Sequence, residues 1–80
     1  MNQPARRLVL MTRPGCHLCH RLEQLVRDNA DGPVELISRD ITTDRELMAK
    51  WKDRIPVVLE DDRVLLEGRP DEDEVAEVVG

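Results

Sequence analysis

The chain has 80 residues, of which 40% are hydrophobic and 36% charged, with a formal net charge of −5. This length predicts one domain over residues 1–80, and the apolar content argues against disorder. The acidic charge and the single Trp, with no Phe or Tyr, argue against nucleic acid as a partner. No apolar run approaches the ~20 residues of a membrane span, and residues 1–7 lack the apolar core of an export signal. We therefore expect a cytoplasmic protein with no membrane partner.

The first two predicted elements are a strand over residues 7–12 and a helix that begins near Cys16. Residues 7–12 (RLVLMT) are mostly apolar and lead into Pro14-Gly15, which is typical of a buried strand followed by a turn. A helix face follows, because apolar residues recur at i, i+4, i+7 and i+8. These residues are Leu18, Leu22, Leu25 and Val26. The turn residues 29–33 end this helix.

A second strand is predicted over residues 34–41 and a second helix after it. Thr43 and Glu46 are spaced as a capping box, in which both side chains satisfy backbone N–H groups at a helix start. Leu47, Met48 and Trp51 give this helix an apolar side. We interpret Trp51 as a core anchor rather than a platform for a ligand.

Two apolar runs, 56–59 and 64–66, flank the polar residues 60–63 and predict a β-hairpin, although no Gly supports a tight turn. Pro70 suits the first position of a third helix, and the acidic residues 71–74 suit its first turn. Val75, Val78 and Val79 form its apolar stripe. The order β-α-β-α-β-β-α predicts an α/β protein, with the first two strands parallel and the last two an antiparallel hairpin.

The residues that carry chemistry are Cys16 and Cys19. Their spacing of three on a helical turn brings the two thiols within disulfide reach. Cys16 falls at the helix N-terminus, where the dipole and free N–H groups lower thiol pKa values to roughly 3.5–7.5 from ~8.5. Cys19, one turn further, is expected to be shielded. This pattern predicts an attacking and a resolving thiol.

Three other interpretations of the cysteines stay open. A purely structural disulfide would gain only about 2 kcal/mol from a loop this short. The run 16–20 (CHLCH) also matches the haem-attachment pattern C-x-x-C-H. Two Cys and two His could share a zinc or iron–sulfur site between two chains. Within the thiol interpretation, His17 has two possible roles: when protonated it would favour the Cys16 thiolate, or it is a solvent-exposed helix residue. His20 is expected to be a surface residue.

The chain resembles the glutaredoxins and the minimal thioredoxin fold. The likeness rests on C-x-x-C after the first strand and Ile55-Pro56 before the third. It is closest to short bacterial glutaredoxin-like proteins, through residues 13–19 (RPGCHLC), 39–41 (RDI) and 54–58 (RIPVV), and extends from about residue 7 to residue 79. The resemblance implies a thioredoxin-like fold, with a four-stranded mixed sheet flanked by helices.

The resemblance also implies site residues. It implies a cis bond before Pro56, where the alternative is an ordinary trans proline opening a strand, and it implies that the backbone of Ile55 pairs with bound substrate. Arg13 matches a basic residue that contacts a carboxylate of glutathione, and it adds positive charge near the thiols. Gly68 remains from a glycine pair that holds the other end of glutathione. The family's frequent Pro-Tyr between the cysteines is replaced by His-Leu, so the aromatic beside glutathione is missing.

These observations favour a thiol–disulfide oxidoreductase in cell redox homeostasis. Cys16 attacks a disulfide and Cys19 resolves the mixed disulfide. We expect a monomer with no bound metal or organic cofactor, with a disulfide-containing protein or glutathione as partner and glutathione as a candidate reductant. The alternative is a thioredoxin-fold binding or sensing module, whose cysteines hold a metal or a partner without turnover.

Overall fold

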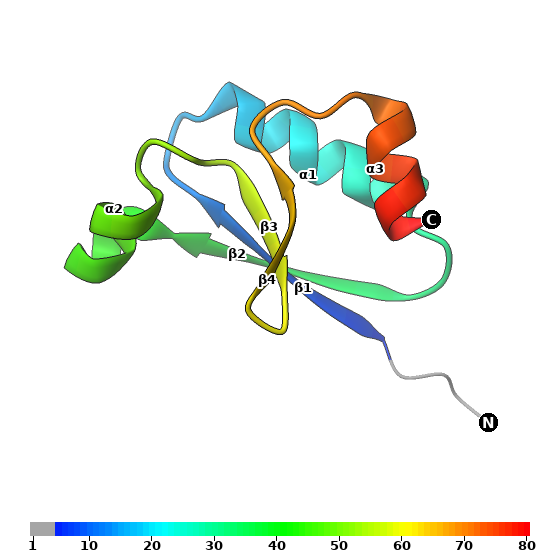
Figure 1. The fold of residues 1–80 in the computed structure, drawn as a ribbon, viewed down its shortest axis with the longest axis horizontal. Helices are drawn as coiled ribbons and strands as arrows, with labels where there is room; N and C mark the ends of the chain where they lie inside the picture. Colours follow the sequence, from blue (N-terminus) through cyan, green and yellow to red (C-terminus); the bar gives the residue numbers. More distant parts are fainter. Residues whose placement is uncertain (1–4) are drawn as a thin grey trace.

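The computed structural model describes residues 5–80, which form a four-stranded mixed sheet with helices on both faces (Figure 1). The elements are β1 (Arg6–Thr12), α1 (His17–Asn29), β2 (Val34–Asp40), a short 3-10 helix η1 (Ile41–Thr43), α2 (Arg45–Trp51), β3 (Val57–Glu60), β4 (Arg63–Glu67) and α3 (Glu72–Val79). This order confirms the predicted α/β arrangement. None of the helices within residues 5–80 is long and apolar enough to cross a membrane.

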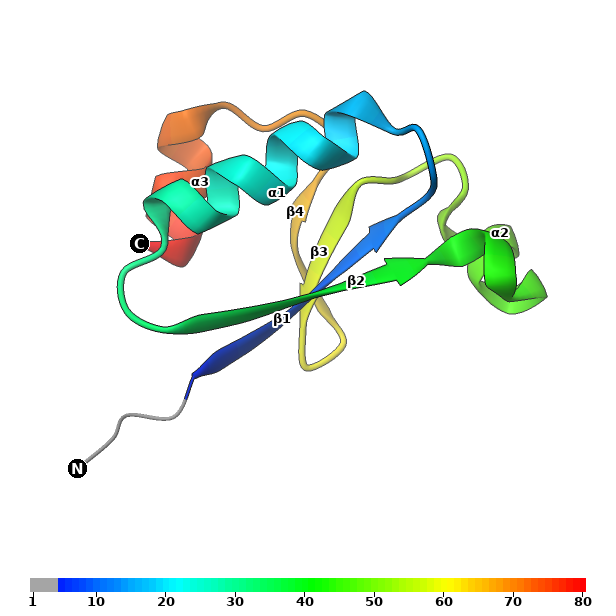
Figure 2. The same ribbon diagram turned by 180° about the vertical axis from the view of Figure 1, so that it is seen from behind.

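The sheet order β2-β1-β3-β4 places the functional segments at one end of the sheet. Strand β1 pairs parallel with β2 and antiparallel with β3, and β3 pairs antiparallel with β4. Met11 lies opposite Val57, and Val57 lies opposite Glu67. The chain leaving β1, the chain entering β3 and the chain leaving β4 therefore meet at the same end, as Figures 1 and 2 show.

The core is divided between the two faces of the sheet. Successive strand residues point to opposite faces, so Leu8 and Leu10 of β1 pack with α1 and α3, whereas Met11 packs with α2. Trp51 is only 4% exposed within the α2 cluster, which confirms its interpretation as a core anchor. Side chains packed on both faces of the sheet therefore fix the end of β1 that leads into Cys16.

Two predicted helix starts were wrong, by one residue for α2 and by two residues for α3. Asp44, not Thr43, caps α2: its carboxylate accepts from the N–H groups of Glu46 and Leu47 at 2.8 and 3.3 Å. Thr43 instead belongs to η1 and donates its hydroxyl to the Asp40 carbonyl. Asp71 caps α3 through the Glu74 N–H at 2.8 Å, so Pro70 precedes the cap rather than opening the helix.

The hairpin turn consists of Asp61 and Asp62 alone, a tighter connection than the predicted residues 60–63. Both residues have positive φ, 50° and 66°. Two successive positive φ values define the primed turn whose twist matches that of the flanking strands. Aspartate tolerates this region better than most residues, because its short side chain can bond the local backbone. The tight hairpin therefore forms without a glycine.

Candidate active site around Cys16 and Cys19

Cys16 is the N-cap of α1 and is joined to Cys19 by a disulfide, with a Cα–Cα distance of 5.2 Å. Its Sγ also accepts a hydrogen bond from the Cys19 N–H at 3.2 Å. The sulfur therefore lies where the first N–H groups of the helix lack helical partners and the dipole is positive. Both features favour negative charge on this sulfur once the disulfide opens.

The two cysteines differ in access to solvent. Cys16 is half-buried, whereas Cys19 is 3% exposed. Cys19, Leu22 and Val26 are all buried and form the stripe of α1 that faces the sheet. Only Cys16 is thus presented to a partner, as expected for an attacking thiol beside a shielded one.

The prediction that Leu18 belongs to the buried face of α1 was wrong. Leu18 is 42% exposed, because it lies about 100° around the helix from Cys19, which starts the buried stripe. An apolar side chain therefore reaches solvent between the two cysteines. The cysteine pair was the sequence signal for this exposure. If Cys19 is buried against the sheet, Leu18, the residue before it, points toward solvent.

Arg13, His17 and His20 surround this helix start and are all exposed. Gly15, in the turn between β1 and Cys16, has a φ of 74°, a conformation that glycine adopts without steric cost. A pocket of about 230 Å³ extends from this turn to Cys19. Its polar lining residues are Thr12, Arg13, His20, Glu23, Ser38 and Asp40.

Asp40, at the end of β2, brings a carboxylate to this pocket. Its pKa is lowered, chiefly because the carboxylate accepts a hydrogen bond from the Thr42 hydroxyl at 2.6 Å. The Thr42 N–H donates to the same oxygen at 2.8 Å. The pocket lining therefore includes a stable negative charge from Asp40 as well as the cationic residue Arg13.

The Ile55–Pro56 segment lies beside the cysteines through the strand register. Pro56 precedes Val57, the partner of Met11, and the Ile55–Pro56 bond is cis. Gly68, with a φ of 75°, donates its N–H to the Pro56 carbonyl at 2.8 Å. The Ile55 N–H already donates to the Trp51 carbonyl at 3.1 Å. The structure therefore brings Ile55, Pro56 and Gly68 together.

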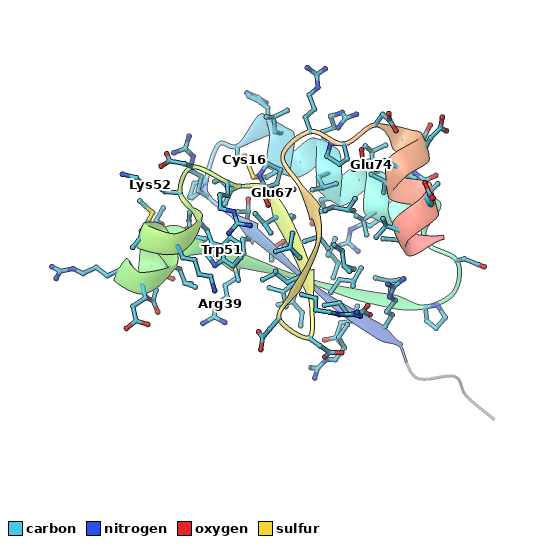
Figure 3. All side chains as sticks on the ribbon, in the orientation of Figure 1. Cys16, Arg39, Trp51, Lys52, Glu67 and Glu74 are labelled. Atoms are coloured by element: carbon cyan, nitrogen blue, oxygen red, sulfur yellow. A yellow bond between two sulfur atoms is a disulfide. The ribbon has the colours of Figure 1, made fainter. Side chains whose placement is uncertain are left out.

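A stack of Glu67, Arg54 and Trp51 supports the same loop, and the sequence analysis missed it. Arg54 donates to both carboxylate oxygens of Glu67 at 3.0 and 2.9 Å, and its guanidinium lies 4.6 Å from the Trp51 ring centre. These hydrogen bonds lower the pKa of Glu67 and raise that of Arg54. Figure 3 shows Trp51 and Glu67 at the same end of the molecule as Cys16.

A hydrogen bond connects the loop that enters α3 to α1. Arg21 donates from its guanidinium to the Pro70 carbonyl at 2.7 Å. Arg69, exposed, lies between this contact and the Gly68–Pro56 hydrogen bond.

Among residues 5–80, no three His, Cys, Asp or Glu side chains gather closely enough to hold a metal ion.

Comparisons with known proteins agree with this architecture. The model of the "Glutaredoxin-like domain (DUF836)" matches residues 7–80. The solution NMR structure of protein Ne2328 from Nitrosomonas europaea is similar, with 28% identity, full coverage of both chains and a TM-score of 0.71. A mutant thioredoxin from Halobacterium salinarum has 23% identity over 91% of this chain and 70% of its own, with a TM-score of 0.59.

A search of curated proteins found no significant match. The structural match to a thioredoxin confirms the thioredoxin-like fold, and the family match covers the cysteine pair, the Ile55–Pro56 loop and all three α-helices. The chain belongs to the family of glutaredoxin-like domains.

Proposed function

We propose that the protein is a thiol–disulfide oxidoreductase that works through Cys16 and Cys19. The observation that carries this proposal is the disulfide between a half-buried N-cap Cys16 and a buried Cys19 at the start of α1. A structural crosslink would need neither the exposure of one sulfur nor its position at a helix N-terminus. Thiols in such positions are the reactive ones.

The reaction proceeds in two exchanges. In the reduced protein, the Cys16 thiolate attacks one sulfur of a substrate disulfide, and the other substrate sulfur leaves as a thiolate that takes a proton from water. Cys19 loses its proton and attacks Cys16, which releases the second substrate sulfur and forms the Cys16–Cys19 disulfide. The substrate gains two electrons and the protein loses two. Two equivalents of an external thiol, for which glutathione is our candidate, restore the dithiol.

Neighbouring residues assist the two exchange steps but are not themselves oxidised or reduced. The Cys19 N–H stabilises the Cys16 thiolate, and the positive charge of Arg13 adds to this effect. We assign His17, the residue next to Cys16, a tuning role for the same thiolate. Because the Ile55 N–H is held by Trp51, the Ile55 carbonyl is the group that we assign to backbone pairing with substrate. Arg13 and Gly68 are the contacts we assign to glutathione. We expect the protein to act in the reducing cytoplasm.

Three variants test the assigned roles. Cys16→Ser should abolish exchange with a small disulfide, whereas Cys19→Ser should accumulate a mixed disulfide on Cys16 that intact mass spectrometry detects. His17→Ala should slow the thiolate-dependent alkylation of Cys16 near neutral pH. A Cys19→Ser protein that turns over fully and carries no adduct would contradict the mechanism.

A redox titration in glutathione buffers separates this function from the binding-module alternative. A reversible loss of two protons, counted by thiol trapping and mass, supports a working dithiol couple. An added glutathione on Cys16 supports the glutathione link. Thiols that stay inert, or a metal that co-purifies in stoichiometric amount, would favour the binding module.

A further inference from the structure

Part of the acidic charge of this protein lies far from the cysteines. The hairpin turn carries Asp61 and Asp62, which line a groove with Arg7 near the start of β1. Acidic α3 begins near the far end of α1, where Glu72 meets Asn29 at 3.3 Å. Cys16, in contrast, follows the end of β1 and begins α1. The hairpin acids and the cysteines thus lie at opposite ends of β1, and Glu72 and the cysteines at opposite ends of α1, whereas Glu23 and Asp40 line the pocket beside Cys19.

The distance between the two ends of β1 or α1 exceeds the Debye length, beyond which exposed charges are largely screened from one another. Strand β1 has 7 residues and α1 has 13, so each spans about 20 Å at ~3.3 and ~1.5 Å per residue. The Debye length is about 8 Å at physiological ionic strength. A partner at Cys16 therefore experiences the local charges of the active-site end, and the net charge of −5 does not predict its preference.

Exposed cations come from three segments at the Cys16 end of the sheet, which are the β1–α1 turn, the residue after α2 and the β4–α3 loop. Arg13 precedes Cys16 by three residues, and Lys52 follows α2 and lies at the same end of the molecule in Figure 3. Arg69 is held nearby by the two hydrogen bonds that fix its loop to Pro56 and to α1. Of the acids at this end, Glu67 is paired with Arg54 through two hydrogen bonds, and Glu23 and Asp40 line the pocket on the Cys19 side.

An apolar contact is available beside these cations. Leu18, 42% exposed, projects from the turn of α1 that holds both cysteines. A small charged thiol compound has little apolar surface to place there, whereas a protein chain carries side chains on both sides of its cysteine. The combination of spread cations and one exposed leucine fits a polypeptide.

We propose that the preferred substrate of the Cys16–Cys19 pair is a protein disulfide whose cysteine is flanked by acidic residues, with Lys52 and Arg69 as the selecting cations and Leu18 as an apolar contact. This inference rests on the proposed oxidoreductase function and specifies its substrate class. The exchange steps are those given above. Charge selection raises the rate of encounter and steers the acidic segment over Cys16.

The test compares two synthetic peptides that share one intrachain disulfide and differ only in glutamate or lysine beside the cysteines. The reduced protein should reduce the glutamate peptide at least about tenfold faster in 0.1 M salt. The difference should nearly vanish in 1 M salt, where the Debye length is about 3 Å. A neutral small disulfide, 2-hydroxyethyl disulfide, reports the chemistry without charge selection.

Charge-reversal variants locate the effect. The double variant Lys52→Glu/Arg69→Glu should lose the preference for the glutamate peptide while it reduces 2-hydroxyethyl disulfide at the original rate. The matched control, Arg7→Glu/Arg63→Glu, changes the net charge equally at the opposite end and should keep the preference. Leu18→Ala should slow both peptides and leave the small disulfide unaffected.

Several outcomes would overturn the inference and leave the oxidoreductase function standing. These are equal rates for both peptides, a preference that survives in 1 M salt, or a control variant that loses the preference as fully as Lys52→Glu/Arg69→Glu. A loss of glutathione disulfide reduction as large as the loss for the glutamate peptide would assign the cations to glutathione instead. Failure with every disulfide, the small one included, would overturn the proposed function itself.

Discussion

Replacing Leu22 and Leu18 with alanine tests the orientation of α1 that creates the active site. Leu22 is fully buried and Leu18 is 42% exposed, although they lie one turn apart. Removing a buried leucine costs about 2–5 kcal/mol, because apolar burial is lost and a cavity remains. An 80-residue domain has a free energy of unfolding of about 4–12 kcal/mol. Leu22→Ala should therefore remove a large part of the stability, and Leu18→Ala less than about 1 kcal/mol.

Urea and thermal unfolding of the oxidised proteins, followed by far-ultraviolet circular dichroism, measure this difference. Each lost kcal/mol lowers the Tm by roughly 4–8 °C in a domain of this size, so Leu22→Ala should melt at least about 8 °C below the parent. Keeping the disulfide intact in all samples removes its contribution from the comparison. Equal losses for the two variants would mean that Leu18 is also buried, and the exposed contact beside Cys16 would not exist.

Three further predictions concern the frame of the site. Asp62→Gly should raise the Tm by a few degrees, because glycine adopts the positive φ of this position without cost; a lower Tm would contradict the turn. Asp44→Ala should cost about 1 kcal/mol in urea unfolding and Thr43→Ala less, since Asp44 caps α2. Hydrogen bonds from Arg6 lower the pKa of Glu60, so the stability they contribute is present above the unfolded-state pKa and lost as pH falls through the folded-state value. The Tm difference between the parent and Glu60→Gln should thus be larger at pH 7 than at pH 3, and a constant difference would refute this role.

The order of elements followed from the sequence because periodicity and turn residues are local signals. Apolar runs ending at Pro14-Gly15 or before the Asp61–Asp62 turn mark strands wherever they occur in a small α/β chain. The position of Cys16 at the helix start followed for the same reason, since a strand, a turn and an i, i+3 cysteine pair lie close together in the sequence. These features needed no knowledge of distant partners.

The features that sequence reasoning missed depend on tertiary contacts. Arg54 and Glu67 are 13 residues apart and meet only because β3 and β4 pair in one register. Thr43 and Asp44 are both good capping residues, and the 3-10 turn η1 that involves Thr43 decides between them. The exposure of Leu18 depends on which stripe of α1 rests on the sheet. In each of these cases the local sequence is compatible with several arrangements, and the tertiary structure selects one of them.

The division of the core between two faces of the sheet has a consequence for how unfolding is observed. Trp51, the single aromatic residue of the chain, belongs to the cluster on the α2 face, and the cluster under α1 and α3 contains no aromatic side chain. Tryptophan emission therefore reports unfolding on the α2 face of the sheet, whereas amide exchange in α1 reports unfolding on the face covered by α1 and α3. Coincident transitions would show that the sheet transmits cooperativity between its faces. Separate transitions would identify two folding units within one small domain.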